Sequence, residues 1–193
     1  MLNKLITSKT RLRLLIKFFI NQANRGYLNG LATEFNESTN SIRKELNHLS
    51  EAGYLEKYKD NNKVGYKANV KHPLFEVLQK VVFKHLGIEE IVERVLERMG
   101  DVKQIYIIGD YAKGLDAGRI EVLLIGDQLN TEYIQALQSK IKDLISREVT
   151  FYLASKFENN QPHILIYENN YYLLYWSWIC RRTNYGSNCF KMS

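Results

Sequence analysis

Short hydrogen-bonding and cationic side chains recur after Ser38 at the spacing of one helix face. They are Thr39, Asn40, Arg43, Lys44 and Asn47. Hydroxyl, amide and guanidinium groups hydrogen-bond to base edges, and cationic groups neutralise phosphates. The chemistry that this pattern predicts is recognition of double-stranded DNA in a major groove.

A helix that begins after Ser38 would hold these side chains on its outer face. The Ser38 hydroxyl can accept from the first backbone N–H groups, and Gly53 can close the helix with a positive φ. Apolar side chains at helical spacing would form the inner face: Ile42, Leu46, Leu49 and Ala52. We expect this inner face to lie against a core.

Two strands are expected directly after this helix. Tyr54 begins an extended run, and Asp60, Asn61 and Asn62 supply turn residues before the chain returns through 63–67. Lys63 and Lys67 would then place positive charge on the hairpin. Upstream, apolar residues at helical intervals predict two further helices, over 9–20 and 28–35.

This order of three helices and a two-stranded wing resembles the winged helix-turn-helix of arsenic-repressor-like (ArsR-like) bacterial transcription regulators. The similarity covers 1–72, and LATEFNESTNSIRKELNHLSEAGYLEK matches the helix-turn-helix core of that family. It implies a double-stranded DNA partner, contacted by Thr39, Asn40, Arg43, Lys44 and Asn47 and by the wing residues Lys63 and Lys67. One alternative stays open, because some winged helices bind only protein.

The distribution of charge favours the DNA interpretation. Residues 1–72 contain 13 Lys and Arg against 6 Asp and Glu, a net charge of +7, whereas the remaining residues contain 14 against 15, a net charge of −1. A basic surface gains affinity for a phosphate backbone through counterion release. The positive excess coincides with the helix and wing.

Composition bounds the class of protein. The 193 residues are 45% hydrophobic and 25% charged, as in ordinary folded proteins, so disorder is not expected to dominate. The run 14–20 is a poor signal peptide and 171–179 is too short to span a bilayer, so we expect a cytoplasmic protein with no membrane partner. Cys180 and Cys189 lack metal-site spacing, and we expect no metal and no cofactor.

Residues 73–100 are interpreted as linker or dimerisation helices. Pro73 can end the wing and open a helix at its first position, and two broad apolar faces follow, ending at Gly87 and Gly100. Helices in this place often form the dimer contact of winged-helix regulators, which implies a homodimer on a pseudo-palindromic site. The alternative, that these helices only cover a second domain, stays open.

The second domain, 101–170, is predicted from its short apolar runs. Four strands are expected, over 102–108, 119–125, 149–153 and 163–167, with an amphipathic helix containing Ile134, Leu137, Ile141 and Leu144. A glycine turn over 109–114 would join the first two strands. The predicted class is α+β, an N-terminal winged helix-turn-helix domain followed by an α/β domain.

The segment IIGDYAKGLDAGRIEVLLIG in this domain resembles the nucleotidyltransferase superfamily. That family has a Gly-Ser turn, two carboxylates on the next strand and a third on a later strand, which hold two Mg²⁺ ions. Here Asp110 follows Gly109, Arg119 and Glu121 occupy the two strand positions, and no acid occurs near 150–152. The departures imply a catalytically degenerate domain with no catalytic residues.

A degenerate domain of this kind is interpreted as a sensor or assembly module. The resemblance would gather Gly109, Asp110, Lys113, Arg119 and Glu121 around a cleft for a small-molecule or nucleotide effector. Two alternatives stay open: a relic scaffold without ligand, and an active nucleotidyltransferase fused to a binding module. The aromatic-rich tail, 171–193, is expected to contact a second subunit or the chain's own second domain.

Overall fold

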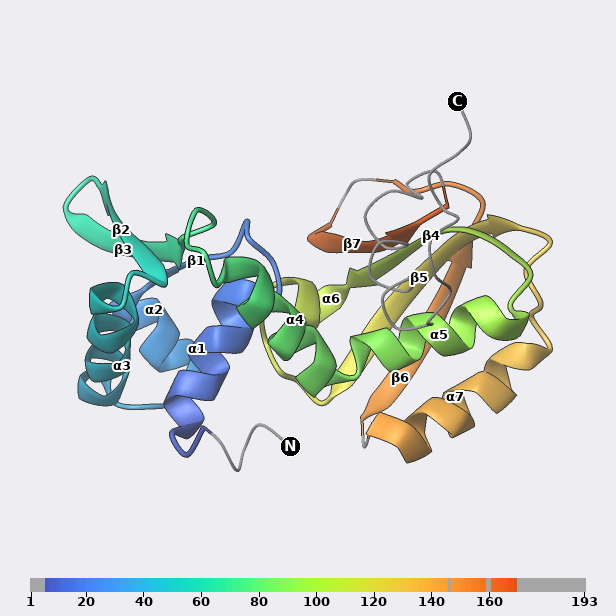
Figure 1. The fold of residues 1–193 in the computed structure, drawn as a ribbon, viewed down its shortest axis with the longest axis horizontal. Helices are drawn as coiled ribbons and strands as arrows, with labels where there is room; N and C mark the ends of the chain where they lie inside the picture. Colours follow the sequence, from blue (N-terminus) through green and yellow to red (C-terminus); the bar gives the residue numbers. More distant parts are fainter. Residues whose placement is uncertain (1–5, 146, 159–160, 170–193) are drawn as a thin grey trace, which may run out of the picture.

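The computed structural model describes residues 6–145, 147–158 and 161–169, which fold into two adjoining lobes (Figure 1). The elements of the first lobe are α1 (Lys9–Phe19), β1 (Arg25–Tyr27), α2 (Leu28–Phe35), α3 (Thr39–Glu51), β2 (Leu55–Asp60) and β3 (Lys63–Ala68). Those of the rest are α4 (Phe75–Leu86), α5 (Ile88–Arg98), β4 (Asp101–Ile108), α6 (Gly109–Ala112), β5 (Arg119–Asp127), α7 (Tyr133–Ile145), β6 (Glu148–Ala154) and β7 (His163–Glu168).

The first lobe is a winged helix. Helices α1, α2 and α3 pack together, and the β2–β3 hairpin projects from the end of α3 (Figure 1). The three predicted helices and both wing strands are confirmed. The sequence reading missed β1, which pairs antiparallel with β3 and gives a sheet of order β1-β3-β2.

Polar side chains and left-handed residues set the ends of these helices. The hydroxyls of Ser8 and Ser38 accept from the backbone N–H of Arg11 and Ser41, each at 3.2 Å, which confirms Ser38 as the N-cap of α3. Gly53, at φ +77°, follows the C-cap Ala52 of α3 and is the C′ residue that was predicted, because a residue with a Cβ is strained at this φ.

The second lobe is a four-stranded sheet of order β6-β5-β4-β7 with α5 and α7 on one face (Figure 1). Strands β4 and β5 are antiparallel, whereas β5 and β6 are parallel and are joined through α7. All four predicted strands and the predicted helix are present. The predicted glycine turn is instead the one-turn helix α6 followed by a loop, with Gly109, Gly114 and Gly118 at positive φ.

Helix α4 joins the two lobes. Its Phe75 ring lies 5.5 Å from the Phe19 ring of α1, and a single cluster of buried apolar side chains runs from α1 through α4 and α5 to the sheet. The Asn21 side chain after α1 also donates to the Ala112 carbonyl of α6 at 3.1 Å. The winged helix therefore packs directly against the second lobe.

Some predicted positions differ in detail. Helix α4 begins at Phe75, so Pro73 precedes the helix and is not its first residue. Several apolar residues assigned to buried helix faces are exposed, and two of them, Ala52 and Leu74, are caps just outside their helices: Ala52, Leu74, Val77, Leu96 and Leu144. In the described residues, no helix has the length and apolar character needed to cross a membrane. The predicted tail, 171–193, lies outside the described residues.

Candidate nucleic-acid interface

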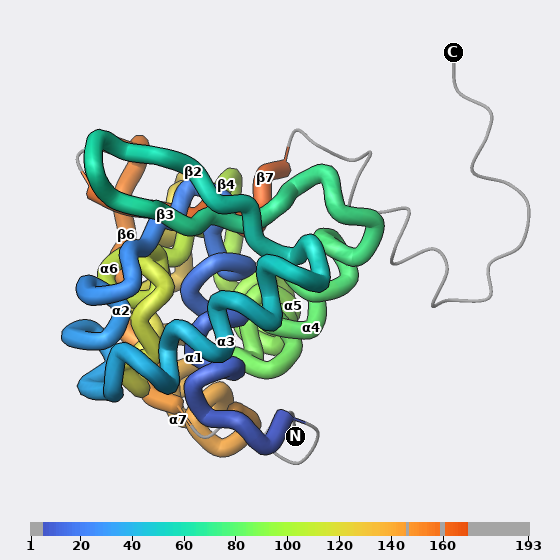
Figure 2. The backbone as a smooth tube through the Cα atoms, turned by 90° about the vertical axis from the view of Figure 1, so that its left-hand side faces the viewer, coloured from blue at the N-terminus to red at the C-terminus, as the bar shows by residue number. Residues whose placement is uncertain are grey.

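The outer face of α3 lies at the far end of the first lobe, beside the wing (Figure 2). Thr39, Asn40, Arg43 and Lys44 are exposed there, and Asn47 is half-buried. Arg43 donates from Nη1 to Asn40 Oδ1 at 2.9 Å, which holds its guanidinium along the helix surface. The structure thus brings all five predicted helix residues onto one face that solvent reaches.

The inner face of α3 is fixed by a buried carboxylate as well as by apolar packing. Ile42, Leu46 and Leu49 are buried as predicted. Glu45 lies among them and accepts from Ser8 Oγ at 2.7 Å and from Arg11 Nε at 2.8 Å. Because both donors belong to α1 or its cap, these bonds set the position of α3 on α1.

The same first helix also holds α2 and the turn that leads into α3. Arg13 Nη1 lies 2.7 Å from the Phe35 carbonyl at the end of α2 and 3.1 Å from Glu37 Oε1 in the turn. Lys17 Nζ lies 2.8 Å from Glu34 Oε1 on α2, although the Lys17 side chain is only 9% exposed. A row of ion pairs along α1 therefore orients the whole helix-turn-helix.

The pKa of Glu45 reflects this arrangement. Burial raises the pKa of this carboxyl, but the hydrogen bonds from Arg11 and Ser8 and the nearby positive charge of Arg11 outweigh burial and lower it below its ordinary value. Glu45 is therefore ionised at neutral pH, and its charge stabilises the contact between α1 and α3.

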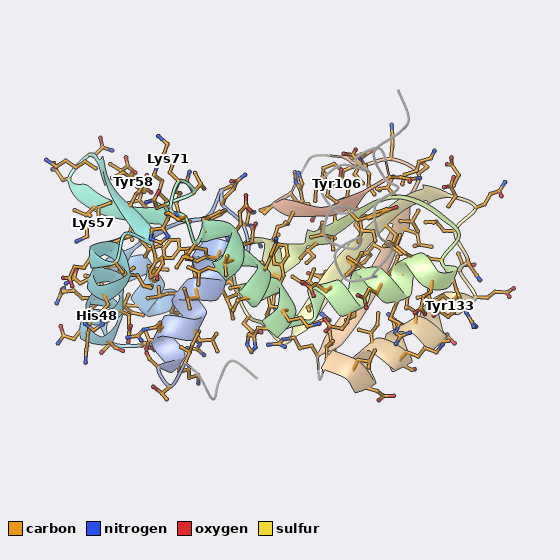
Figure 3. All side chains as sticks on the ribbon, viewed as in Figure 1. His48, Lys57, Tyr58, Lys71, Tyr106 and Tyr133 are labelled. Carbon is orange, nitrogen blue, oxygen red and sulfur yellow. The ribbon has the colours of Figure 1, made fainter. Side chains whose placement is uncertain are left out.

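The wing presents different lysines on its two faces. Side chains alternate along a strand, so Lys57 and Lys59 share the face of buried Leu55, which turns toward the helices. Figure 3 shows Lys57 on the side of the wing toward α3. Lys63 and Lys67 lie on the opposite face, because they pair with Asp60 and Glu56 in the register.

Lysines on the face toward α3 are the better placed to extend the interface. Lys67 Nζ is already 2.9 Å from Glu56 Oε2, whereas Lys59 is exposed and forms no ion pair within the described residues. Lys57 lies over the Tyr66 ring, 5.9 Å from its centroid. Sequence reasoning missed Lys57 and Lys59, although two-residue alternation from Leu55 could have found them.

Aromatic contacts brace the outer half of the wing. The Tyr27 ring of β1 meets the Tyr58 ring of β2 edge-on at 6.3 Å, and the Tyr27 hydroxyl donates to Asp60 near the hairpin turn. Gly65 lies beneath Tyr58, since a Cβ added there would stand 2.3 Å from Tyr58 Cζ. β1 therefore ties the wing to the start of α2.

In the second lobe, Gly109 and Glu121 lie together as the sequence predicted. A Cβ added to Gly109 would stand only 1.7 Å from Glu121 Oε2, so the carboxylate occupies the place of any larger side chain. Glu121 pairs with Thr150 in the sheet register, and its Oε1 accepts from the Tyr152 hydroxyl at 3.2 Å. The group of β6 that meets Glu121 is therefore a phenol hydroxyl and not a carboxylate.

The other predicted cleft residues spread outward from this point. Asp110 and Lys113 form an exposed pair on α6 at 3.7 Å, and Arg119 is exposed at the start of β5. Of the two carboxylates among these residues, Asp110 is exposed and paired with Lys113, and only Glu121 lies on the sheet beside Gly109, so the set does not fit a two-Mg²⁺ site. Across the described ranges, no three His, Cys, Asp or Glu side chains gather as a metal-binding group.

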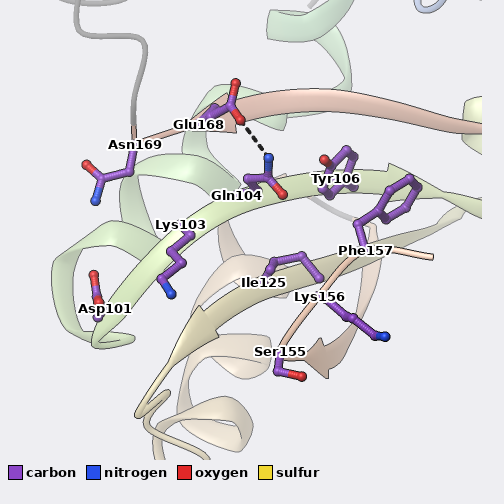
Figure 4. A pocket seen from close by; sticks show the side chains of 10 residues that line it. All are labelled: Asp101, Lys103, Gln104, Tyr106, Ile125, Ser155, Lys156, Phe157, Glu168 and Asn169. Atoms are coloured by element: carbon purple, nitrogen blue, oxygen red, sulfur yellow. Dashed lines mark hydrogen bonds between the residues drawn. The ribbon is translucent and has the colours of Figure 1, made fainter. Parts of the chain in front are cut away.

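A hollow of about 610 Å³ lies elsewhere on this sheet, at the opposite end of β4 from Gly109 (Figure 4). Tyr106 borders it and stacks on Phe157 at 4.2 Å, while Gln104 donates to Glu168 at 2.6 Å. Gln104 and Glu168 satisfy one another within its lining, and none of the predicted cleft residues lines it.

No protein-family model and no curated protein matches the chain. Among solved structures, reduced HlyU from Vibrio cholerae N16961 is similar at 17% identity with a TM-score of 0.35, over 43% of this chain and 82% of that one. A similarity of this size assigns no function. The winged-helix assignment rests on the order and pairing of α1 to β3.

Proposed function

We propose that this protein is a DNA-binding transcription regulator that reads double-stranded DNA with α3 and the wing. The observation that carries the proposal is the exposed face of α3, which bears Arg43 and Lys44 and lies beside the wing that bears Lys57 and Lys59. On this face of α3, the hydroxyl and amide side chains of Thr39, Asn40 and Asn47 can hydrogen-bond to base edges. The cationic side chains can bind phosphates, as in recognition helices.

A homodimer belongs to this proposal. Two copies would present two α3 helices to half-sites about one turn, roughly 34 Å, apart. Leu74 and Val77 support it, because they are 44% and 52% exposed at the start of α4, next to the winged helix. A cytoplasmic location remains a prediction of the sequence.

The second lobe is proposed to be a nucleotidyltransferase-like module that senses a ligand or supports assembly and does not catalyse transfer. Support comes from the contact of Gly109 with Glu121 and from the mixed β4–β5–β6 sheet. Arg119 and Tyr152 in place of carboxylates are the reason to propose that catalysis is lost.

The test is selection of genomic fragments by the purified protein at near-physiological salt with excess competitor DNA. The expected result is enrichment of a few fragments that share a short inverted repeat, with a spacing of about one helical turn. A folded protein that enriches no sequence would contradict DNA recognition and favour a winged helix that binds protein.

A further inference from the structure

The junction between the two lobes contains a cavity of about 350 Å³. Its walls come from four separate parts of the chain: the start of α1, the end of α4, the loop around 116 and the loop around 147. Ile6, Leu12 and Ile16 provide an apolar side, while the remaining walls are polar and charged. A volume of this size accommodates a small metabolite.

Cationic groups predominate around this cavity. Lys9 and Arg13 project from successive turns of α1, and Arg147 projects from the second lobe. Asp116 is the one carboxylate among the lining residues, and it lies 3.4 Å from Arg147 Nη2. Lys9 forms no ion pair within the part of the chain that the structure describes, so the cavity has an unbalanced positive charge.

Arg147 is held rigidly enough to serve as an anchor. Its side chain is only 16% exposed, and it donates to the His85 carbonyl and to the Tyr111 hydroxyl, each at 3.2 Å. The Tyr111 hydroxyl in turn donates to Asp116. Burial, followed by the charge of Arg147, lowers the pKa of His85, so its ring is neutral and adds a donor without adding charge.

We propose that this junction cavity binds a small phosphate-bearing molecule, held by Lys9, Arg13 and Arg147. Guanidinium groups bind phosphate oxygens in pairs and an ammonium group adds a compact charge, so the three groups complement a phosphate. The first turn of α1 contributes further, because its Ser8-capped N-terminus carries a partial positive charge toward Thr7 and Lys9.

The site has a direct route to the proposed DNA interface. Arg13 lines the cavity and also holds the Phe35 carbonyl and Glu37 in the turn before α3. A phosphate that draws the Arg13 guanidinium competes with Glu37 and so changes how firmly that turn is held. This coupling rests on the proposed function, whereas the binding site itself does not.

Binding is tested without DNA, by calorimetric titration of pyrophosphate and of AMP at about 50 mM salt. We expect saturable binding to the wild-type protein and a loss of about tenfold or more in Lys9→Glu, since one charge beside the anion is reversed. Lys80→Glu is the matched control, because Lys80 is exposed on α4 and does not line the cavity. It should bind within about twofold of wild type.

Equal binding by the two variants, or no saturable binding to wild type, would overturn the site. Arg13→Gln gives a second check, with circular dichroism to establish that each variant is folded. The coupling is measured separately, as DNA affinity with pyrophosphate against sodium chloride of equal ionic strength. Equal DNA affinities in the two salts would refute the coupling only. Absence of DNA binding would refute the proposed function, but the calorimetry would still show whether the cavity binds phosphate.

Discussion

Arg11 Nε on α1 donates to Glu45 Oε2 on α3 across 2.8 Å, and the Glu45 side chain is only 9% exposed. A charged group thus occupies the face of α3 that packs on the core. Because the Arg11 side chain is itself 41% exposed, solvent screens part of the attraction. The pair therefore fixes the position of α3 on α1, and solvent limits its contribution to the stability of the fold.

Glu45→Gln should lower the free energy of unfolding by about 1–2 kcal/mol at pH 7, since the replacement removes the charge but keeps an acceptor. The pKa of Glu45 is lower in the folded state than in the unfolded chain, where it is about 4.3. The stabilisation is therefore complete above that value and is lost as pH falls through the folded pKa. Urea unfolding of both proteins at pH 7 and pH 3 checks this: the difference should shrink at pH 3, and an unchanged difference would contradict the assignment.

Replacing Arg43 and Lys44 together by Ala should weaken DNA binding and flatten its salt dependence. Each phosphate contact contributes about 0.9 to the slope of log affinity against log salt, so the loss of two contacts predicts a decrease of about 1.8. Fluorescence anisotropy over a range of salt concentrations measures both effects. A Lys80→Ala, Arg98→Ala protein is the control, because both residues are exposed on α4 and α5, away from α3. An unchanged slope in the α3 variant would remove that helix from the interface.

The wing offers a sharper comparison between pairs of lysines. Lys57→Ala with Lys59→Ala should reduce DNA affinity more than Lys63→Ala with Lys67→Ala, because the first pair faces α3 and Lys67 is paired with Glu56. Both double variants remove two positive charges, so non-specific attraction changes equally. Anisotropy at one salt concentration is sufficient, and a larger loss from the second pair would mean that the DNA contacts the opposite face.

The sequence was sufficient for most elements because their periodicities are strong and their ends are marked. Ser38 and Gly53, for example, bound α3 as predicted. β1 was missed because Arg25–Tyr27 is only three residues long and becomes a strand through pairing with β3. Glu45 is buried by partners on α1, 34 and 37 residues away in sequence, and no local pattern shows such a contact.

The candidate sites were predicted unevenly for the same reason. Gly109 and Glu121 meet because neighbouring strands align them, a relation that a motif can carry. The junction cavity depends on α1 meeting a loop more than 100 residues later, so Lys9 and Arg147 have no shared motif. Sites formed by segments distant in sequence, such as this cavity, depend on tertiary packing, which the sequence alone does not give.

Alanine substitutions at two glycines of positive φ distinguish the stability cost of backbone strain from the cost of a steric clash. Gly118→Ala should cost about 1 kcal/mol, because φ is +80° but a Cβ would meet open space. Gly87→Ala, at φ +78°, should cost about 2–4 kcal/mol, since its Cβ would stand 2.3 Å from Ile145 Cγ2. Urea unfolding of both variants measures the difference. Equal costs would show that Ile145 moves aside without loss, so that α7 packs loosely against the α4–α5 turn.

The last test is an assay of nucleotidyl transfer. If catalysis is lost, as proposed, the incorporation of nucleotide does not depend on the carboxylate of Glu121. Incubation with labelled nucleoside triphosphates and Mg²⁺ or Mn²⁺ should give only background incorporation, for the wild type and for Glu121→Ala alike. Arg119 and Tyr152 leave Glu121 as the single acid at that point of the sheet, and one carboxylate cannot hold two divalent ions in line. Incorporation that falls with Glu121→Ala but persists in Glu148→Ala, an exposed acid on β6, would restore an active enzyme.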